Sequence, residues 1–347
     1  MTWVNDFTEM LFSLDPQKIN VEGAYILKAQ HLPASIFKYY RVTKHSLQNF
    51  EENKVWLTNP RKLNDPYDCA VSVNHDHMMN EGLRTLRAEL AKMSSNKLSG
   101  DAIAKIVESN KPLEMLMDQW FEIEPAEKIE DQKNAIRQIF KFINEMLDQT
   151  WFEDNKNAFK ICSFSERVDS TIMWAHYAHY HKGFCIEYDI RSLPIDDYRS
   201  RFLYPIIYSD RVFEGTEHFI RTVRDEQLND LYLNMAGLIK AADWSYEKEW
   251  RLLFANEVMK DEQAYPMPKP KAVYLGSHIK TKDQQMLIDI CDKQKIQVLK
   301  MKRSIREFLM VPCSIKEADE QLTSHEFIKI LKYVRTKLRQ LKSRGQV

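Results

Sequence analysis

The sequence contains little glycine and none of the common glycine-rich phosphate or nucleophile loops. Only eight of its 347 residues are glycine, and no GxGxxG, GxxxxGKS, GxxxxGKT or GxSxG string occurs. These strings mark Rossmann folds, P-loop proteins and α/β-hydrolases, because glycine lets the backbone approach a phosphate or turn sharply. The sequence excludes these three classes, so any cofactor must be bound in another way.

Cysteine is scarce as well. The five cysteines are scattered through the chain with no CxxC pair: Cys69, Cys162, Cys185, Cys291 and Cys313. An odd number of dispersed cysteines fits reduced thiols better than a disulfide framework. We therefore expect a reducing compartment.

Net charge and long apolar runs are both absent. Fifty Lys and Arg residues balance fifty Asp and Glu residues, so the whole molecule has no electrostatic bias toward polyanions or membrane surfaces. No stretch approaches the roughly 18 apolar residues that span a bilayer, and the N-terminal MTWVNDFTEMLFSL lacks a basic leader start. These absences predict a cytoplasmic protein that neither enters a membrane nor is exported.

The hydrophobic pattern predicts the fold class. An apolar share of 44% can form a sizeable core, in one large domain with an insertion or in two domains. Strand-like and helical spacing alternate from Ile36 to Asp68 and again after residue 156, whereas apolar residues recur every three or four positions between these regions. We expect an α+β fold with a central mixed or antiparallel sheet. Its expected parts are an N-terminal helical segment (1–30), an α/β core (31–76 and 156–315), a helical insertion (77–155) and a basic C-terminal helix (316–347).

Individual elements can be predicted within this plan. The expected strands are IFKYYRV, VWLTN, FKICSFS, GFCIEYD, IIYSDRV, EWRLLFANEV, KAVYLG and QVLKMKR. The expected helices are HSLQNFEEN, TIMWAHYAHY, residues 217–243 and DQQMLIDICDKQ.

The first polar motif to consider is NDPYD, from Asn64 to Asp68. Two turn-forming side chains beside a proline are typical of an Asx-turn that closes the preceding strand. Alternatively, the polar groups beside Tyr67 present Asn64 and Asp65 to a ligand. Both interpretations stay open.

The segment MWAHYAHYHKGF carries three histidines, of which His176 shares a helical face with Tyr180 if the helix continues. The spacing does not match HExxH, and no carboxylate accompanies the histidines, so we expect no metal. The structural interpretation is that Trp174 and Tyr177, with Met173, pack a helix onto the sheet.

In WSYEKEWR, Glu247 and Glu249 stand two residues apart at an expected strand start, which places both carboxylates on one face. Like charges at this separation repel unless a cation or a cationic transition state lies between them. The alternative is that Glu249 pairs with its same-face neighbour Arg251 on a solvated edge.

The motif FKYYR places Arg41 on the same strand face as Phe37 and Tyr39. An arginine on a mostly apolar face needs an anionic partner. That partner is either structural, such as Asp65 or Asp68, or a ligand phosphate.

The motifs together resemble a known family. FKYYR, LNDPYD, CSFS, MWAHYA with HKGFCIEYD, and YEKEWR look like a widespread bacterial family catalogued as a domain of unknown function, often seen near mobile or defence genes. The resemblance covers about residues 36 to 310.

A second resemblance carries chemistry. Arg41, then Ser163 and Ser165, then Glu247 and Glu249 are similar in type and order to the Arg, Ser-x-Ser and Glu-x-Glu elements of ADP-ribosyltransferases. This resemblance implies that Arg41 holds an NAD phosphate, that the two serines support the nicotinamide half, that Glu249 is catalytic and that Glu247 orients the acceptor. The remaining residues of the expected NAD site are Tyr39, Asn64, Asp65, Trp174, His176 and Tyr177, and Trp174 or Tyr177 is expected to stack on nicotinamide.

The chemistry suits these residue types. Cleavage of the nicotinamide–ribose bond develops oxocarbenium character, which a nearby carboxylate stabilises without a metal. The leading hypothesis is therefore an NAD-consuming transferase or glycohydrolase acting as a toxin or phage-defence effector, with NAD as substrate. The alternatives are a nucleic-acid-binding or nuclease-like defence effector and a non-catalytic nucleotide sensor.

The tail FIKILKYVRTKLRQLKSR forms a basic amphipathic helix. Its apolar stripe comprises Phe327, Ile330, Leu331, Val334, Leu338 and Leu341. Either the stripe docks on the core and leaves a solvated basic face, or the helix binds a partner such as RNA or an acidic protein.

Overall fold

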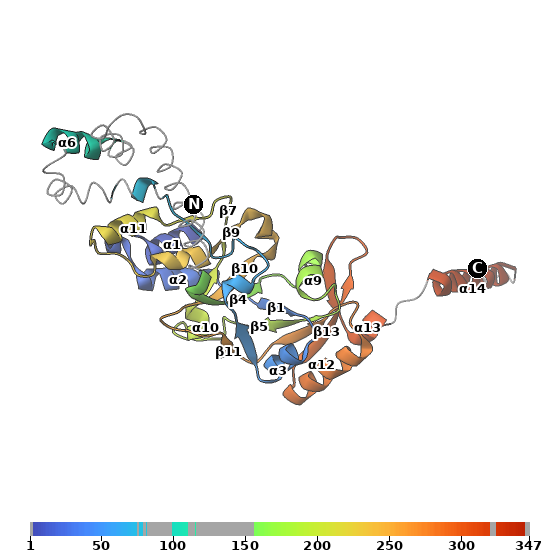
Figure 1. Cartoon of the computed structure of the whole chain (residues 1–347). Coiled ribbons are helices and arrows are strands. Elements are labelled where there is room, and N and C mark those ends of the chain that lie inside the picture. The colour runs from blue at the N-terminus through green and yellow to red at the C-terminus, as the bar shows by residue number, and fades with distance from the viewer. Residues whose placement is uncertain are drawn as a thin grey trace, which may run out of the picture. The chain divides into compact units, whose positions relative to one another are not determined.

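The computed structural model describes residues 3–74, 76–78, 81, 99–109, 115, 156–319 and 324–343 (Figure 1). The chain divides into two compact units. Unit 1 comprises Met1–Ile36, Lys54–Glu166 and Asp189–Met267, and unit 2 comprises Phe37–Asn53, Arg167–Tyr188 and Pro268–Val347.

The fold is mixed α+β with a large mixed sheet of eight strands, as the sequence predicts. These strands are β1 (Ile36–Tyr40), β4 (Phe159–Ser165), β5 (Phe184–Tyr188), β6 (Leu203–Pro205), β10 (Glu249–Ala255), β12 (Ala272–Leu275), β13 (Gln297–Arg303) and β14 (Met310–Cys313). Unit 1 holds the order β4-β10-β6. Unit 2 holds the order β14-β13-β12-β5-β1, apart from Ile36 at the start of β1.

Strands β4 and β10 form the centre of unit 1. They pair antiparallel over their full length, from Glu249 opposite Ser165 to Ala255 opposite Phe159. Both strands are buried almost throughout, so their polar residues, such as Glu249 and Arg251 of β10, are buried together with the apolar ones. Helix α1 (Trp3–Phe12) contributes Phe7 and Leu11 to the same hydrophobic cluster as Ile161 of β4 and Leu253 of β10.

The rest of unit 1 consists of short elements. Its helices are η1 (Pro16–Lys18), α2 (Val21–His31), η2 (Pro60–Lys62), α6 (Gly100–Glu108), α10 (Tyr198–Arg201), α11 (Thr216–Val223), η4 (Tyr232–Gly237) and η5 (Ala242–Glu247). Its small two-stranded sheets are β2 (Lys54–Leu57) with β11 (Gln263–Pro266), β3 (Val71–Ser72) with β8 (Phe213–Glu214), and β7 (Ile207–Ser209) with β9 (Ile239–Ala241).

Unit 2 also contains helices among its described residues. They are α3 (Lys44–Glu51), α9 (Thr171–Tyr177), α12 (Thr281–Gln294), α13 (Ile315–Asp319) and α14 (Ser324–Ser343). Helix α12 connects β12 to its parallel neighbour β13, because a parallel pair requires a crossover connection. A capping box between Thr43 and Ser46 begins α3.

Two helix predictions are wrong in detail. Residues 217–243 contain α11, η4 and the strand β9 instead of continuous helix. Helix α9 ends at Tyr177, and His179, Tyr180 and His181 have positive φ angles of 49°, 55° and 64°, so Tyr180 does not share a helical face with His176. The turn returns the chain to β5 at Gly183, where a Cβ atom would lie 2.0 Å from a backbone oxygen of β1.

The predicted insertion and tail are only partly described. Most of residues 77–155 lies outside the described residues, and α6 is a helix within that range. Helix α14 confirms the predicted C-terminal helix, but its described apolar side chains, Ile328, Ile330, Leu331, Val334 and Leu338, are 45–52% exposed. These described side chains of α14 are thus not buried against the rest of the described chain, and both interpretations of the stripe stay predictions. No helix in the described part of the chain has the length and apolar character to cross a bilayer.

A buried lysine of α2 stabilises unit 1. The ammonium of Lys28 donates to the carbonyl oxygens of Ser200, Arg201 and Leu203 at 2.9, 2.8 and 2.9 Å, and the residue is 2% exposed. These carbonyls belong to the end of α10 and the start of β6, where a helix end leaves acceptors unsatisfied. Lys28 therefore links α2 to the edge of the central strands.

We predict that Lys28→Met destabilises the full chain by about 3 kcal/mol, because it leaves buried carbonyls without a donor. Lys18→Met is the matched control, since Lys18 forms an exposed ion pair with Glu9 and its loss costs less than about 1 kcal/mol. Chemical denaturation followed by tryptophan fluorescence measures both. Equal effects of the two substitutions would contradict the role of Lys28.

Candidate functional site

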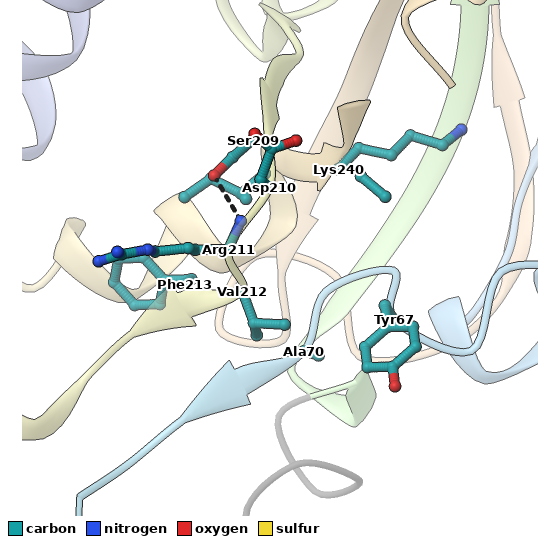
Figure 2. A pocket seen from close by; sticks show the side chains of 10 residues that line it. Tyr67, Ala70, Ser209, Asp210, Arg211, Val212, Phe213 and Lys240 are labelled. Carbon is teal, nitrogen blue, oxygen red and sulfur yellow. Dashed lines mark hydrogen bonds between the residues drawn. The ribbon is translucent and has the colours of Figure 1, made fainter. Parts of the chain in front are cut away.

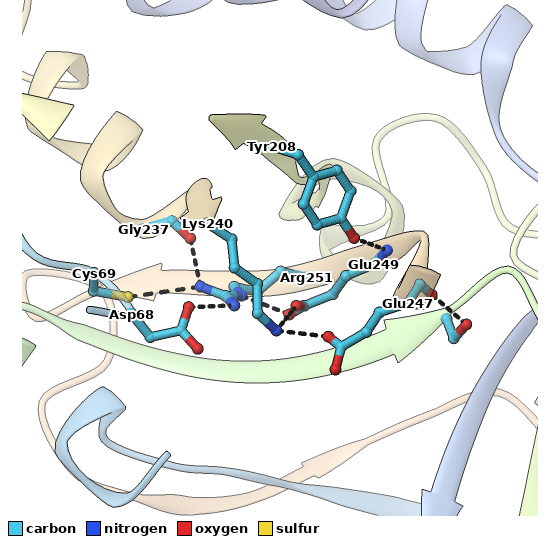
Figure 3. Close-up of polar contacts among 9 residues, drawn as sticks. Asp68, Cys69, Tyr208, Gly237, Lys240, Glu247, Glu249 and Arg251 are labelled. Atoms are coloured by element: carbon cyan, nitrogen blue, oxygen red, sulfur yellow. Dashed lines mark hydrogen bonds and ion pairs between the residues drawn. The ribbon is translucent and has the colours of Figure 1, made fainter. Parts of the chain in front are cut away.

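Five charged side chains meet inside unit 1 (Figure 3). We call them the buried charge network, and its members are Asp68, Lys240, Glu247, Glu249 and Arg251. All five residues are buried, although charged residues are almost never fully buried unless they are paired. Three carboxylates and two cations thus replace their hydration with contacts to one another.

Arg251 is the centre of the network. Its guanidinium is 0% exposed and donates through Nε to Glu249 Oε1 at 2.8 Å, through Nη2 to Asp68 Oδ1 at 2.9 Å and through Nη1 to the Gly237 carbonyl at 2.9 Å. A Cβ atom on Gly237 would lie 2.1 Å from Leu253 Cδ1, so a larger residue here would require the Leu253 side chain to shift. The planar guanidinium thereby links β10 to the NDPYD turn and to η4.

Lys240 of β9 lies between the two glutamates. Its ammonium is 2.6 Å from Glu247 Oε2 and 2.8 Å from Glu249 Oε2. Glu247 ends η5 and Glu249 begins β10, and Lys248 between them has a left-handed φ of 44°. The prediction of two glutamates on one strand face is therefore wrong. The left-handed residue instead lets both carboxylates reach the same cation.

Backbone contacts fix the two glutamates. The Ser165 hydroxyl donates to the Glu247 carbonyl, and the Glu249 amide donates to the Tyr208 hydroxyl at 2.8 Å. Glu249 also pairs with Arg251, as one interpretation of the sequence held, but the pair is buried and does not lie on a solvated edge.

Electrostatics keep the network charged. Burial alone would raise the pKa of Glu249, but Arg251 and Lys240 outweigh it and hold that pKa well below its usual range. Burial would likewise lower the pKa of Lys240, whereas Glu249 and Asp68 raise it. Cys69 contacts Arg251, yet burial raises the pKa of its thiol to about 12, so this cysteine stays protonated and is no nucleophile at neutral pH.

A pocket of about 340 Å³ lies beside the network (Figure 2). The loop Ser209–Phe213 forms one part of its lining, and Tyr67, Ala70, Ile239, Lys240 and Ala241 form the rest. Tyr67 is 57% exposed. Figure 2 shows the ammonium of Lys240 directed away from Arg211, so the lysine stem lines the pocket while its charged end belongs to the network.

The predicted site residues of unit 1 lie around these features. Asp65 Oδ1 accepts from the Tyr67 amide at 2.8 Å, which confirms the Asx-turn, while Asn64 is exposed. Ser165 pairs in register with Glu249, and Ser163 with Arg251. Glu247, Glu249 and Ser165 are thus brought together.

The other predicted residues belong to unit 2. Arg41 follows the end of β1 and is exposed, so it does not lie on the strand as expected. Trp174 is fully buried, with its Nε1 donating to the Val168 carbonyl at 2.7 Å, so its ring has no open face for stacking in this structure. His176 is exposed, Tyr177 is half-buried, and buried Tyr39 donates its hydroxyl to the Arg167 carbonyl. Their roles in ligand binding stay predictions.

Sequence reasoning missed several members of the site. Asp68 lies within NDPYD and was considered only as a partner of Arg41, whereas it pairs with Arg251. Lys240 and Tyr208 stand in segments without any motif signal. The single available signal was the need of two neighbouring glutamates for a cation.

Comparison with known proteins gives one match. Residues 173–252 match the family model described as Protein of unknown function (DUF2971). This match supports the domain-of-unknown-function family. The matched segment holds Lys240, Glu247, Glu249 and Arg251 of the network, whereas Asp68 lies outside it. No curated protein and no solved structure matches the chain.

We predict that Lys240→Met reverses the pH dependence of stability on the acidic side. In the native chain, the lowered pKa of Glu249 contributes stability above its ordinary value of 4.5, and this contribution is lost as pH falls through the folded-state pKa. Without Lys240, the two buried glutamates repel and their pKa values rise. We expect a loss of about 3 to 5 kcal/mol at neutral pH, with partial recovery as the pH is lowered toward about 5.

Lys248→Met is the control, because this neighbouring lysine is exposed and lies outside the network. Urea unfolding near neutral pH and near pH 5 measures both variants. A Lys240→Met chain as stable as Lys248→Met, or one that becomes less stable on acidification, would refute the bridging role of Lys240.

Proposed function

We propose that the chain binds an NAD-type dinucleotide and cleaves its nicotinamide–ribose bond, with Glu249 as the catalytic carboxylate. The observation that carries the proposal is the placement of an ammonium between Glu247 and Glu249, at 2.6 and 2.8 Å. Two carboxylates held around a cation form an environment suited to an oxocarbenium ion. Lys240 occupies in the resting chain the place that the reacting ribose takes in this proposal.

The strand pairing supports the resemblance to ADP-ribosyltransferases. Their Ser-x-Ser and Glu-x-Glu elements correspond by resemblance to Ser163, Ser165, Glu247 and Glu249. Glu249 stands opposite Ser165 in the β4–β10 register, and the Ser165 hydroxyl bonds to the Glu247 backbone. Elements far apart in the sequence therefore form one group, as a shared site requires.

The proposed reaction needs no metal. The bond between ribose C1′ and the nicotinamide nitrogen breaks, and its electron pair leaves with nicotinamide, which becomes neutral. The ribosyl oxocarbenium ion is then captured by water, giving ADP-ribose and a proton, or by an acceptor nucleophile that loses its own proton. Glu249 stabilises the developing positive charge, and Glu247 orients the acceptor.

Access to Glu249 requires that Lys240 moves. The Glu249 side chain is 1% exposed, and its two oxygens are bound by Arg251 and Lys240. Lys240 also lines the 340 Å³ pocket, whose volume lies within the usual range for small-molecule sites. A ligand phosphate in this pocket would attract the ammonium and release one oxygen of Glu249.

The burial of Glu249 favours a second candidate function, a nucleotide sensor without turnover. In that case a nucleotide binds in the pocket and draws Lys240 away from the glutamates. The resulting rearrangement of the buried charge network, without any reaction, is then the signal. We further propose, from the family resemblance, that either activity serves a toxin or phage-defence effector.

We predict that the full chain releases nicotinamide from NAD and that Glu249→Gln lowers the rate by about a hundredfold or more. The measurement is chromatography of free nicotinamide over time, with and without cell extract as a source of acceptor. Glu247→Gln is the matched control for damage to the network, and we expect it to reduce transfer more than hydrolysis.

Three outcomes separate the hypotheses. Equal rates in the native and Glu249→Gln chains, with equal melting temperatures, would eliminate the catalytic role. NAD binding without nicotinamide release would establish the sensor instead. Absence of both binding and release would overturn the proposed function.

A further inference from the structure

A second concave surface in unit 1 shares no residue with the pocket beside Lys240. It has a volume of about 680 Å³ and lies among η2, the start of β4 and the segment between β10 and β11. No aromatic residue belongs to its lining. It therefore offers no platform on which a nucleobase or other ring could stack.

Cations dominate this surface. Its lining contains more positive than negative side chains. The cations are Arg61, Lys62, Lys160 and Lys260, and the carboxylates are those of Asp261 and Glu262. Asparagine side chains supply most of the remaining polar groups. Because the whole chain is neutral, this local excess of positive charge is not a consequence of composition.

One of the two carboxylates is already committed to the protein. Glu262 Oε1 accepts from the Thr58 hydroxyl at 2.9 Å and the Asn59 amide at 2.8 Å, and Oε2 pairs with Lys62. Burial alone would raise the pKa of Glu262, but these hydrogen bonds lower it to about 2. Glu262 thus stays ionised, and its contacts hold Thr58, Asn59 and Lys62 in position at one side of the concave surface.

Lys160 is the unusual group. It is 5% exposed, and among the residues that the structure describes its ammonium has one hydrogen-bond partner, Asn256 Oδ1 at 2.9 Å. An ammonium has three donors, and burying it beside a neutral amide is unfavourable unless an anion completes the site. Arg61 and Lys260 of the same lining are exposed, so their charged ends can reach a ligand.

We propose that this concave surface binds the phosphate groups of a ligand, with Lys160 as the buried anchor and Arg61 and Lys260 as exposed contacts. Lysine and arginine bind phosphate oxygens through charge-assisted hydrogen bonds, and asparagine amides add neutral donors. The lack of aromatic side chains means that the site contacts phosphates and not bases. The ligand is either a nucleic-acid backbone or a small polyphosphate, which share this chemistry.

The test uses the full chain and two probes. Binding of a labelled single-stranded oligonucleotide is followed by fluorescence anisotropy at several salt concentrations, and binding of pyrophosphate by calorimetry. Arg61→Gln with Lys260→Gln is expected to weaken binding about tenfold or more and to reduce the salt slope by about 1.4, because two phosphate contacts to a single strand are lost. Both substitutions are at exposed positions and leave the fold intact.

Lys160→Met gives an independent readout. Because no carboxylate among the described residues pairs with the buried ammonium, its replacement by an apolar side chain of similar length is expected to preserve or raise the melting temperature while abolishing binding. A purely structural lysine would instead lower the melting temperature when replaced. Lys329→Gln with Lys332→Gln, in the exposed α14, is the control for binding through the basic tail.

Each outcome decides the proposal. Binding of both probes, weakened in the Arg61/Lys260 variant and lost in Lys160→Met, assigns the site to phosphate groups in general. Binding of the oligonucleotide alone assigns it to a nucleic-acid backbone, and binding of pyrophosphate alone to a small polyphosphate. Absence of binding by the native chain overturns the proposal. Binding that only the α14 variant removes, or a Lys160→Met chain that is destabilised and still binds, overturns it as well.

Discussion

Three carboxylates and two cations with almost no exposure to solvent must satisfy one another inside unit 1. Each charge is costly to bury alone, so the positions of all five are coupled. Arg251 bonds at once to Glu249, to Asp68 at the end of the NDPYD motif and to the Gly237 carbonyl. Lys240 bonds to Glu247 and Glu249. The network thus links segments that are distant in the sequence.

The same constraint shapes what the site can do. Both oxygens of Glu249 are bound, so the carboxylate proposed for catalysis meets substrate only after Lys240 leaves it. Lys240 lines a pocket of about 340 Å³, where a phosphate could compete for the ammonium. Under our proposal the lysine therefore couples ligand binding to exposure of Glu249. The phosphate site proposed around Lys160 differs from the network, because there a buried cation has a neutral amide, and no carboxylate, as its partner among the described residues.

The sequence predicts six of the eight strands of the large sheet but misses the short edge strands β6 and β14, and it predicts the site only in part. Buried strands such as FKICSFS and EWRLLFA are recognisable because apolar and β-branched or aromatic residues cluster between turns. The motif EKE also marks the two glutamates of the buried charge network. The sequence does not reveal the left-handed Lys248, which aims both carboxylates at one cation, or the choice of Lys240 as that cation. Partners so distant in the chain depend on tertiary packing, and no local pattern encodes them.

The ionisation of Glu249 tests the buried charge network most directly. Carbon-13 NMR of glutamate-labelled chain, with the resonance assigned by its loss in Glu249→Gln, follows the carboxyl group as the pH is lowered. The account predicts an ionised Glu249 through its ordinary pKa of 4.5 for as long as the chain stays folded, because Arg251 and Lys240 hold its pKa low. Protonation of Glu249 at or above pH 4.5 in the folded chain would contradict the account.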